Sequence, residues 1–279
     1  MNKGLNINCI WDKTPYNSTA LIHGARKGHQ EIVALLIRRG ADIHFKNYDE
    51  NTALIAAAKK GHLHLVDYLL QEGANIDDCD NDGRTALIHA AFKGHVITGH
   101  RATAEFLVRK GANLNHRDKH GRTALYLATA FCQEGMVKLL LEYGANTEVE
   151  DSTGGTALTR ASWMGNVKVM KLLMDSGANK EHKDKYDMTP LMHATVWGRK
   201  EGTELLNPGG LNEVNENDEK YHQEVGKILS TLREEDETLP GLLKIINSLI
   251  PEHLRVSETS STSSSDEDDA ESVKEAYYA

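Results

Sequence analysis

The sequence lacks the features of membrane, secreted and disulfide-bonded proteins. Its 279 residues contain no apolar run close to the ~18 residues that a membrane-spanning helix needs. The N-terminal stretch MNKGLNINCIWDK has no apolar core followed by a small-residue cleavage site, so we expect no secretory signal. Cys9, Cys79 and Cys132 match neither a disulfide framework nor a CxxC metal pair. We expect no membrane association and a reducing, cytoplasmic location, with the nucleus as an alternative.

Signatures of catalysis and of metal or cofactor binding are absent as well. The sequence has no P-loop, no HExxH zinc pair and no glycine-flanked nucleophilic serine. Among its 14 histidines, His62 and His64 lie two residues apart on an expected helix and so face different directions. We therefore expect no enzyme activity, no cofactor and no metal site.

Basic character is scarce, and the net charge of -9 is unevenly distributed. Residues 257–279 hold seven acidic residues against Lys274, a net charge of -6, which leaves -3 for the first 256 residues. No aromatic residues interleave with a basic stripe, so we expect no nucleic-acid binding.

What the sequence does contain is a repeated unit. Copies of the pattern TALIHAAFKGH begin with threonines spaced 33, 33, 38, 33 and 33 residues apart. A glycine follows 21 residues after each threonine, or 26 residues after it in the third copy. The threonines are Thr19, Thr52, Thr85, Thr123, Thr156 and Thr189, and the glycines are Gly40, Gly73, Gly111, Gly144, Gly177 and Gly210.

A unit that reads TPLH-like, then GH, then LL, then GA resembles the ankyrin repeat, from about Leu5 to Asn215. The resemblance implies an all-α solenoid of helix-turn-helix repeats with projecting β-hairpin fingers. In each repeat the threonine caps an inner helix, Gly-His ends it, and an outer helix follows until the second glycine. No repeat can bury its own apolar face, so stacking supplies the core.

Four departures from the pattern modify this expectation. An insertion of five residues near 95–99, placed as VITGH, should bulge between the helices of repeat three, either as a tolerated loop or as a second contact surface. Cys132 and Gln133 replace Gly-His in repeat four, which predicts a longer inner helix. The degenerate repeat six has its outer helix at EGTELLNPGG or, in another register, at 224–232. Residues 4–8 resemble a finger with no helices before it, so either the chain is a fragment of a longer array or this finger is an N-terminal cap.

The pattern divides the chain into three parts. Residues 1–216 form the repeat domain and residues 217–256 form C-terminal capping helices. The two amphipathic segments of this second part, 220–233 and 239–254, cover the last repeat or bind a partner. Residues 257–279 are acidic, rich in serine and of low complexity, which predicts disorder.

The resemblance implies a binding site on the concave face, formed by the finger tips and by two positions at the end of each inner helix. In the first half these positions are basic, and in the second half they are apolar. The basic candidates are Arg26, Lys27, Lys59, Lys60 and Lys93, with Lys119 and Arg122 in a finger; the apolar candidates are Phe131, Trp163, Met164 and Trp197, with Tyr186 and Met188 in a finger.

Two interpretations of these side chains stay open. Trp163 and Trp197 form a binding hot spot, or they are core residues beneath the C-terminal helices. The lysines attract an acidic protein segment, or they form a solvated surface.

Modification sites are predicted outside this face. Ser263, Ser264 and Ser265 each have an acidic residue three positions on, which resembles the target of an acidophilic kinase. The tail competes for the basic half of the face, more strongly when phosphorylated, or it only confers solubility. Asn115 resembles the position that asparaginyl hydroxylases modify in ankyrin repeats.

The sequence therefore predicts a non-enzymatic, monomeric adaptor, scaffold or inhibitor that binds a protein partner. The alternative is a recruiting or regulatory subunit of a ubiquitin ligase or kinase complex that docks through the C-terminal helices.

Overall fold

The computed structural model describes residues 7–10, 18–93 and 98–208, which contain twelve helices in six antiparallel pairs. The odd-numbered inner helices are α1 (Ala20–Lys27), α3 (Ala53–Ala58), α5 (Ala86–Lys93), α7 (Ala124–Ala130), α9 (Ala157–Met164) and α11 (Pro190–Val196). The even-numbered outer helices are α2 (Gln30–Arg38), α4 (Leu63–Gln71), α6 (Thr98–Arg109), α8 (Glu134–Glu142), α10 (Val167–Asp175) and α12 (Lys200–Leu206).

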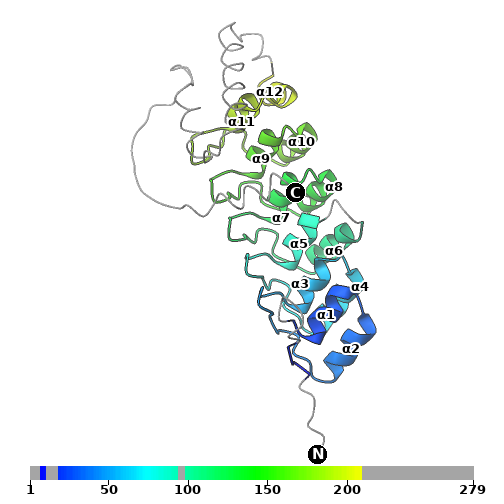
Figure 1. Cartoon of the computed structure of the whole chain (residues 1–279). Helices are drawn as coiled ribbons and strands as arrows, with labels where there is room; N and C mark the ends of the chain where they lie inside the picture. Colours follow the sequence, from blue (N-terminus) through cyan, green and yellow to red (C-terminus); the bar gives the residue numbers. More distant parts are fainter. Residues whose placement is uncertain (1–6, 11–17, 94–97, 209–279) are drawn as a thin grey trace, which may run out of the picture.

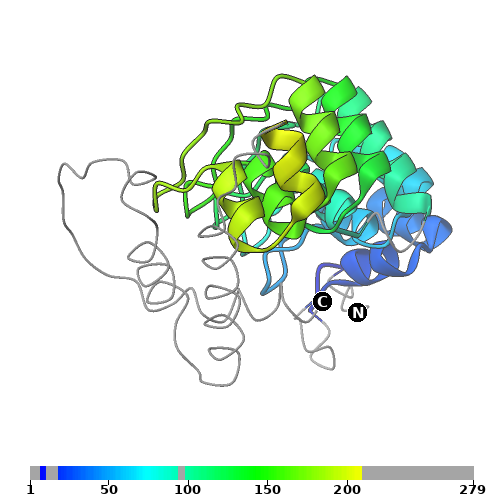
Figure 2. The same cartoon turned by 90° about the horizontal axis from the view of Figure 1, so that it is seen from above.

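The helix pairs stack in chain order to form an elongated solenoid (Figure 1). Inner helices lie in the middle layer, outer helices lie on one side, and the connecting loops project as fingers on the other side. Figure 2, viewed from above, shows that successive pairs are staggered, so the stack curves gradually. The all-α solenoid is the predicted fold, whereas the C-terminal capping helices fall outside the described residues.

Each inner helix begins where the sequence predicts, because a threonine hydroxyl caps it. The Oγ1 atom of Thr52 accepts a hydrogen bond from the backbone N–H of Ile55 at 3.3 Å, and Thr85 does the same for Ile88 at 3.3 Å. Such caps satisfy N–H groups that lack a partner in the first helical turn. The same bond forms at Thr19, Thr123, Thr156 and Thr189.

The core lies between the stacked helices and consists of small inner-helix residues and larger outer-helix residues. Ala57 and Ala58 of α3 are fully buried, and so are Val66 and Leu69 of α4. Alanine lets the inner helices approach closely, and the aliphatic side chains fill the space behind them. No single pair could bury these residues alone, which is why the repeats must stack.

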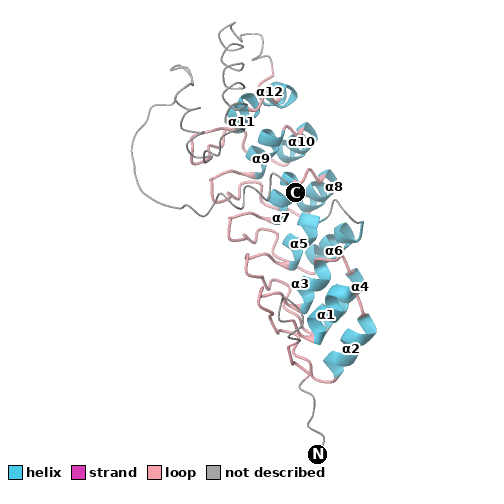
Figure 3. Cartoon of the chain, in the orientation of Figure 1, coloured by secondary structure: helices cyan, strands magenta, loops and turns pink. Residues whose placement is uncertain are grey.

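The fingers are turns rather than β-hairpins. Figure 3 colours them as loops, and the described residues form only two isolated antiparallel bridges, Ile10 with Thr19 and Cys79 with Thr85. An acidic residue five positions before the threonine organises most of these turns. Oδ1 of Asp80, for example, accepts hydrogen bonds from the backbone N–H groups of Asp82 and Arg84, both at 3.0 Å. The same pair of bonds forms at Asp118, Asp151 and Asp184, and at Asn47 in the first finger.

A second set of hydrogen bonds joins neighbouring repeats behind the inner helices. The side chains of the residues that precede α4, α8 and α12 donate to a backbone carbonyl near the end of the inner helix of the preceding repeat. His62 Nε2 lies 3.3 Å from the carbonyl oxygen of Arg26, and Gln133 Nε2 lies 3.1 Å from that of Phe92. In repeat six, Arg199 Nε bonds to Trp163 O at 3.1 Å.

In repeat three, the residue that makes this bond is the histidine of the second Gly-His. His100 Nε2 lies 3.1 Å from the carbonyl oxygen of Lys59, in the same relation as His62 to the preceding repeat. Helix α6 begins at Thr98, so part of the insertion is an extra helical turn. Residues 94–97, where the predicted bulge would lie, fall outside the described residues.

Replacing His100 with alanine is expected to lower the free energy of unfolding by about 1–3 kcal/mol, because a buried ring is removed and the carbonyl of Lys59 loses its partner. The His100 side chain is well buried, at 3 % relative exposure. Urea unfolding followed by circular dichroism measures the loss. His64→Ala, which removes an exposed ring from α4, should change stability by less than about 0.5 kcal/mol; equal losses in the two variants would refute the role given to His100.

The expectation of a longer inner helix in repeat four is wrong. Helix α7 ends at Ala130, and Cys132 adopts a left-handed conformation with φ +54°, the conformation that Gly28 adopts in repeat one with φ +78°. The bond between Gln133 and Phe92 holds the chain in the turn, and this compensates the steric cost of a left-handed cysteine. The helix therefore ends without glycine.

The sequence left two alternatives open at the ends of the array: the position of the last outer helix and the role of the N-terminal segment. Helix α12 occupies the EGTELL segment and contacts α10 and α11, the position of the first register. At the other end, Oδ1 of Asn8 accepts a hydrogen bond from the N–H of Asp42 at 2.8 Å, as Asp77 does from Asn113 at 3.0 Å. The segment around Asn8 thus contacts the first finger as one finger contacts the next. Residues 224–232 of the other register lie outside the described residues.

Candidate partner-binding face

The candidate binding residues lie at the end of each inner helix, beside the fingers. We call this surface the inner-helix face. It is formed by Arg26, Lys27, Lys59, Lys60, Phe92, Lys93, Ala130, Phe131, Trp163, Met164, Val196 and Trp197. The side chain of Lys93 is not among those that the structure describes, and Phe131 and Trp197 are the residues that immediately follow α7 and α11.

Aromatic residues of neighbouring repeats form pairs on this face. The ring of Phe92 meets that of Phe131 edge-on, with centroids 4.6 Å apart and an interplanar angle of 77°. Trp163 and Trp197 repeat this geometry at 5.3 Å and 74°. In both pairs a residue of one repeat contacts the following position of the next repeat. Edge-to-face packing of this kind is favourable and holds each ring in a fixed orientation.

These rings are half-buried rather than enclosed in the core. Phe92, Phe131, Trp163 and Trp197 all keep part of their surface exposed, as do Ala130 and Met164 between the two pairs. Arg160 places its guanidinium 4.2 Å from the centroid of the Trp163 ring, which adds a cation–π contact. The face therefore presents a preorganised row of aromatic edges beside positive charge.

The basic half of the face contains two kinds of residue. Lys27 and Lys60 are exposed, and neither forms a salt bridge with another residue in the described part of the chain. Lys59 instead belongs to the fold: its Nζ lies 2.6 Å from Oδ1 of Asn51 and 3.3 Å from Oδ2 of Asp80. Burial lowers the pKa of Lys59, and Asp80 opposes that shift.

Arg26 lies between these two classes. It is half-exposed, and its Nη2 lies 3.3 Å from Nδ1 of His23. The exposed cations of the face at α1 and α3 are therefore Lys27 and Lys60.

The finger residues differ in how accessible they are. Lys119 is exposed, and its backbone N–H bonds to the carbonyl of Asp82 in the preceding finger at 2.9 Å. Arg122 is only 17 % exposed and directs Nε and Nη2 to Oδ2 of Asp118 at 3.0 and 2.9 Å. Arg122 is therefore committed to holding its finger, and of these two residues Lys119 is the accessible charge.

Met188 is a correction to the predicted site. Its exposure is 1 %, because it ends a finger turn and its N–H bonds to Oδ1 of Asp184 at 3.0 Å, which places its side chain inside. Tyr186, in the same turn, stays half-exposed beside the apolar end of the face. Of the two finger residues, only Tyr186 remains a candidate for contact.

Two buried histidines bond to the finger carboxylates. Nε2 of His89 lies 2.7 Å from Oδ2 of Asp80, and Nε2 of His193 lies 2.7 Å from Oδ2 of Asp184. In both cases the other carboxylate oxygen, Oδ1, accepts backbone N–H groups of the finger turn, so the carboxylate joins the ring to the backbone. The pKa of His89 is lowered to about 4, mainly by burial; the hydrogen bond to Asp80 opposes this shift and the positive charge of Lys59 adds to it.

Asn115, the predicted hydroxylation site, lies exposed in the third finger. Its Oδ1 accepts a hydrogen bond from the N–H of Asn146 at 2.9 Å, and so helps to join two fingers. Hydroxylation of this residue stays a prediction. Ser263, Ser264 and Ser265 lie outside the described residues.

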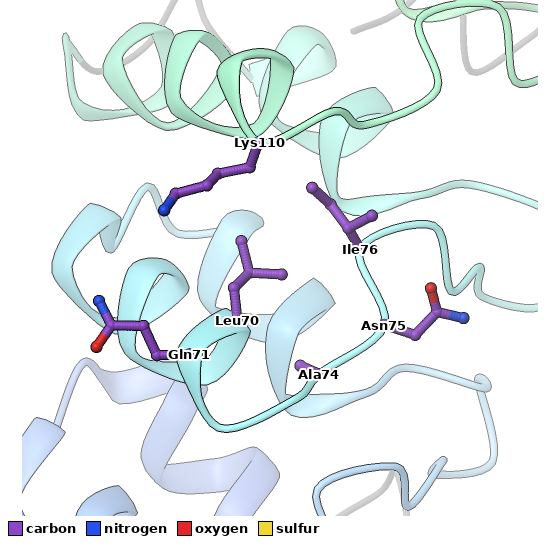
Figure 4. A pocket seen from close by; sticks show the side chains of 6 residues that line it. All are labelled: Leu70, Gln71, Ala74, Asn75, Ile76 and Lys110. Atoms are coloured by element: carbon purple, nitrogen blue, oxygen red, sulfur yellow. The ribbon is translucent and has the colours of Figure 1, made fainter.

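The described residues offer little for chemistry on a small molecule. An open hollow of about 430 Å³ lies between α4 and α6. Figure 4 shows Leu70, Ile76 and Lys110 in its wall. The other side chains around it are Gln71, Ala74 and Asn75, and the six include no carboxylate, histidine, serine or cysteine that could act with Lys110. No group of three or more metal-binding side chains occurs in the described ranges. Among these same residues, no helix combines the length and apolarity that would let it cross a membrane.

Sequence reasoning missed four parts of this arrangement. The aspartates five residues before the threonines recur in register, so their spacing could have identified them as the anchors of the fingers. The partners of the carboxylates and the aromatic pairs across repeats left no such signal, because they depend on how two repeats pack in space. The contact between Arg160 and Trp163 was missed for the same reason.

Comparison with known proteins identifies a family whose sequence pattern matches this chain. A family model described as ankyrin repeats (3 copies) matches residues 21–118, 94–184 and 132–218, and these matches together cover most of the chain. A search of curated proteins found no match.

Proposed function

The chain belongs to the ankyrin-repeat family, whose repeats generally act as protein–protein interaction modules, and from this premise we propose a specific role for its inner-helix face. The protein is a non-enzymatic adaptor, scaffold or inhibitor that binds a protein partner on this face and the adjoining finger tips. It acts as a monomer in the cytoplasm or nucleus.

One observation carries the proposal: the two aromatic pairs are half-exposed at positions where folding does not require aromatic residues. Repeats one and two have Arg26 and Lys60 at the positions that Trp163 and Trp197 occupy in repeats five and six, and their helices form in the same way. Half-exposed tryptophans on a rigid scaffold are typical of binding hot spots, because they offer a large contact area with little entropy to lose.

The charge distribution supports a partner with two chemical parts. The exposed Lys27 and Lys60 lie at the ends of α1 and α3, and the aromatic pairs extend from α5 to α11. A complementary partner presents acidic residues to the first part and apolar side chains to the second. The acidic part contributes mainly to the association rate and to specificity, whereas the apolar part contributes most of the affinity.

The double variant Trp163→Ala/Trp197→Ala is expected to lose its protein partner in an affinity pull-down analysed by mass spectrometry. Truncation of a hot-spot residue costs about 2 kcal/mol or more, so affinity should fall at least tenfold. Circular dichroism must first show that the variant keeps its helices.

A matched control separates this effect from a general loss of apolar surface. Ile32 and Leu35 of α2 are 50 % and 47 % exposed, and both lie on an outer helix. The variant Ile32→Ala/Leu35→Ala should keep the partner. A folded tryptophan variant that retains every partner would contradict the proposal, and deletion of residues 220–254 would then test docking through the C-terminal segments.

A further inference from the structure

The inner-helix face has a fixed chemical order along the solenoid. Positive charge comes first, at Lys27 and Lys60 near the ends of α1 and α3. The aromatic edges come next, beginning with the Phe92–Phe131 pair between α5 and α7. A ligand that satisfies both parts must carry acidic residues and aromatic residues in a matching sequence.

The last residues of the chain have this composition and order. Five acidic residues occur within six positions, and two adjacent tyrosines follow shortly before the end of the sequence. The acidic residues are Asp266, Glu267, Asp268, Asp269 and Glu271, and the tyrosines are Tyr277 and Tyr278. These residues lie outside the described part of the chain, so only their sequence enters the argument.

We propose that residues 257–279 bind the inner-helix face of the same chain, with the acidic run on Lys27 and Lys60 and the two tyrosines on the Phe92–Phe131 pair. The inference rests on the proposed function, because the tail occupies the surface assigned to the partner. Partner and tail therefore exclude each other.

The lengths are compatible with this placement. Packed helices lie about 8–10 Å apart, so Phe131 in repeat four lies about 16–20 Å from Lys60 in repeat two. From Asp269 to Tyr277 the chain has eight residue steps, which span at most about 26–29 Å when extended. From Pro208 to Asp266 there are 266 − 208 = 58 steps, and their extended reach of up to about 190–210 Å exceeds the length of five repeat steps, about 40–50 Å.

Charge distinguishes this face from the outer one. On the outer helices, Nζ of Lys168 lies 3.6 Å from a carboxylate oxygen of Glu134, and Nζ of Lys138 lies 4.0 Å from that of Glu142. Lys27 and Lys60 form no salt bridge within the described ranges. An acidic segment is therefore attracted to Lys27 and Lys60 more strongly than to Lys138 or Lys168.

The experiment is zero-length carbodiimide coupling in the full chain, which joins a carboxylate directly to a lysine amine. Coupled peptides are identified by mass spectrometry in a mixture of ¹⁴N- and ¹⁵N-labelled protein. We expect the acidic run to couple to Lys27 and Lys60 within one copy, at least fivefold more than to Lys138 or Lys168. Coupling should fall at 0.5 M salt, where the charges are screened.

The variant Tyr277→Ala/Tyr278→Ala tests the aromatic half and should reduce this coupling severalfold, although every carboxylate and lysine remains. Unchanged coupling in that variant would overturn the two-part contact. Coupling spread evenly over the outer-helix lysines, or only between labelled and unlabelled copies, would overturn binding within the chain. Neither result depends on the pull-down with Trp163→Ala/Trp197→Ala, so the tail and the partner site can fail separately.

Discussion

An Asp118→Ala chain is expected to lose about 3–5 kcal/mol of its free energy of unfolding, because two arginines near the middle of the array lose their shared partner. The Asp118 side chain has 0 % exposure. Its Oδ2 lies 2.9 Å from Nη2 of Arg122 and 3.7 Å from Nε of Arg84, and its Oδ1 accepts two backbone N–H groups of the finger.

The size of the expected loss follows from what remains after the substitution. Arg122 is only 17 % exposed and stays largely desolvated without a counter-charge, whereas Arg84, 21 % exposed, keeps the exposed carboxylate of Asp82 at 3.3 Å. The finger turn also loses the acceptor of two N–H groups. Removing one partner of a buried ion pair lowers the free energy of unfolding much more than removing one partner of an exposed pair, because the remaining charge is buried without compensation.

Urea unfolding at pH 7 measures the difference, with Asp82→Ala as the matched control. Asp82 lies in the same finger as Arg84 and its side chain is 56 % exposed, with a carboxylate oxygen 3.3 Å from Nη1 of Arg84. Its removal should cost no more than about 1 kcal/mol. A loss for Asp118→Ala no larger than that for Asp82→Ala would show that the buried network does not stabilise the fingers.

The second large effect is a loss of stability in mild acid that originates from His89. Burial lowers the pKa of this ring to about 4 in the folded chain, whereas an unfolded histidine has a pKa near 6.5. Between these values the unfolded state binds a proton that the folded state does not. Stability therefore falls as the pH decreases from about 6.5 to about 4, by about 3 kcal/mol for this residue.

Asp80 also makes the free energy of unfolding fall as the pH decreases, but at lower pH than His89 does. Burial alone would raise the pKa of its carboxyl, but hydrogen bonds from His89 and from the backbone of Arg84, together with the charge of Lys59, hold it below the usual value. Its contribution is present above the ordinary aspartate pKa and is lost as the pH decreases further. The two groups together predict continuous acid destabilisation.

The measurement is the free energy of unfolding at several pH values between 7 and 4, in wild type and in His89→Gln. Glutamine keeps an N–H donor for Asp80 but does not titrate, so the variant should lack most of the slope between pH 6.5 and 4. His64→Gln, at an exposed position, should keep the wild-type slope. The same slope in all three chains would rule out His89 as its source.

Local signals made most of the fold predictable. A threonine cap and a glycine in the left-handed conformation act within one turn of the chain, so Thr52 and Gly73 mark helix ends directly. The exception was repeat four, where Cys132 takes the conformation of the missing glycine. The bond that holds it comes from Gln133 to the preceding repeat, and no local pattern encodes a contact between repeats.

The candidate site was predictable only in part, for the same reason. Register placed Trp163 and Trp197 on one face, but not in contact with each other. The repeat register also predicted that Met188 and Arg122 are accessible on the surface. Sequence position does not say which way a side chain in a finger turn points. The structure places the first of these inside and pairs the second with Asp118.

Site-specific photo-crosslinking tests most directly whether a protein partner contacts the inner-helix face. A photoreactive phenylalanine analogue replaces Met164, which is half-exposed between the aromatic pairs, or Lys171, which is exposed on α10. The partner retained in the pull-down should cross-link to position 164 and not to position 171. Cross-linking at 171 without any at 164 would place the partner on the outer helices and contradict the proposed site.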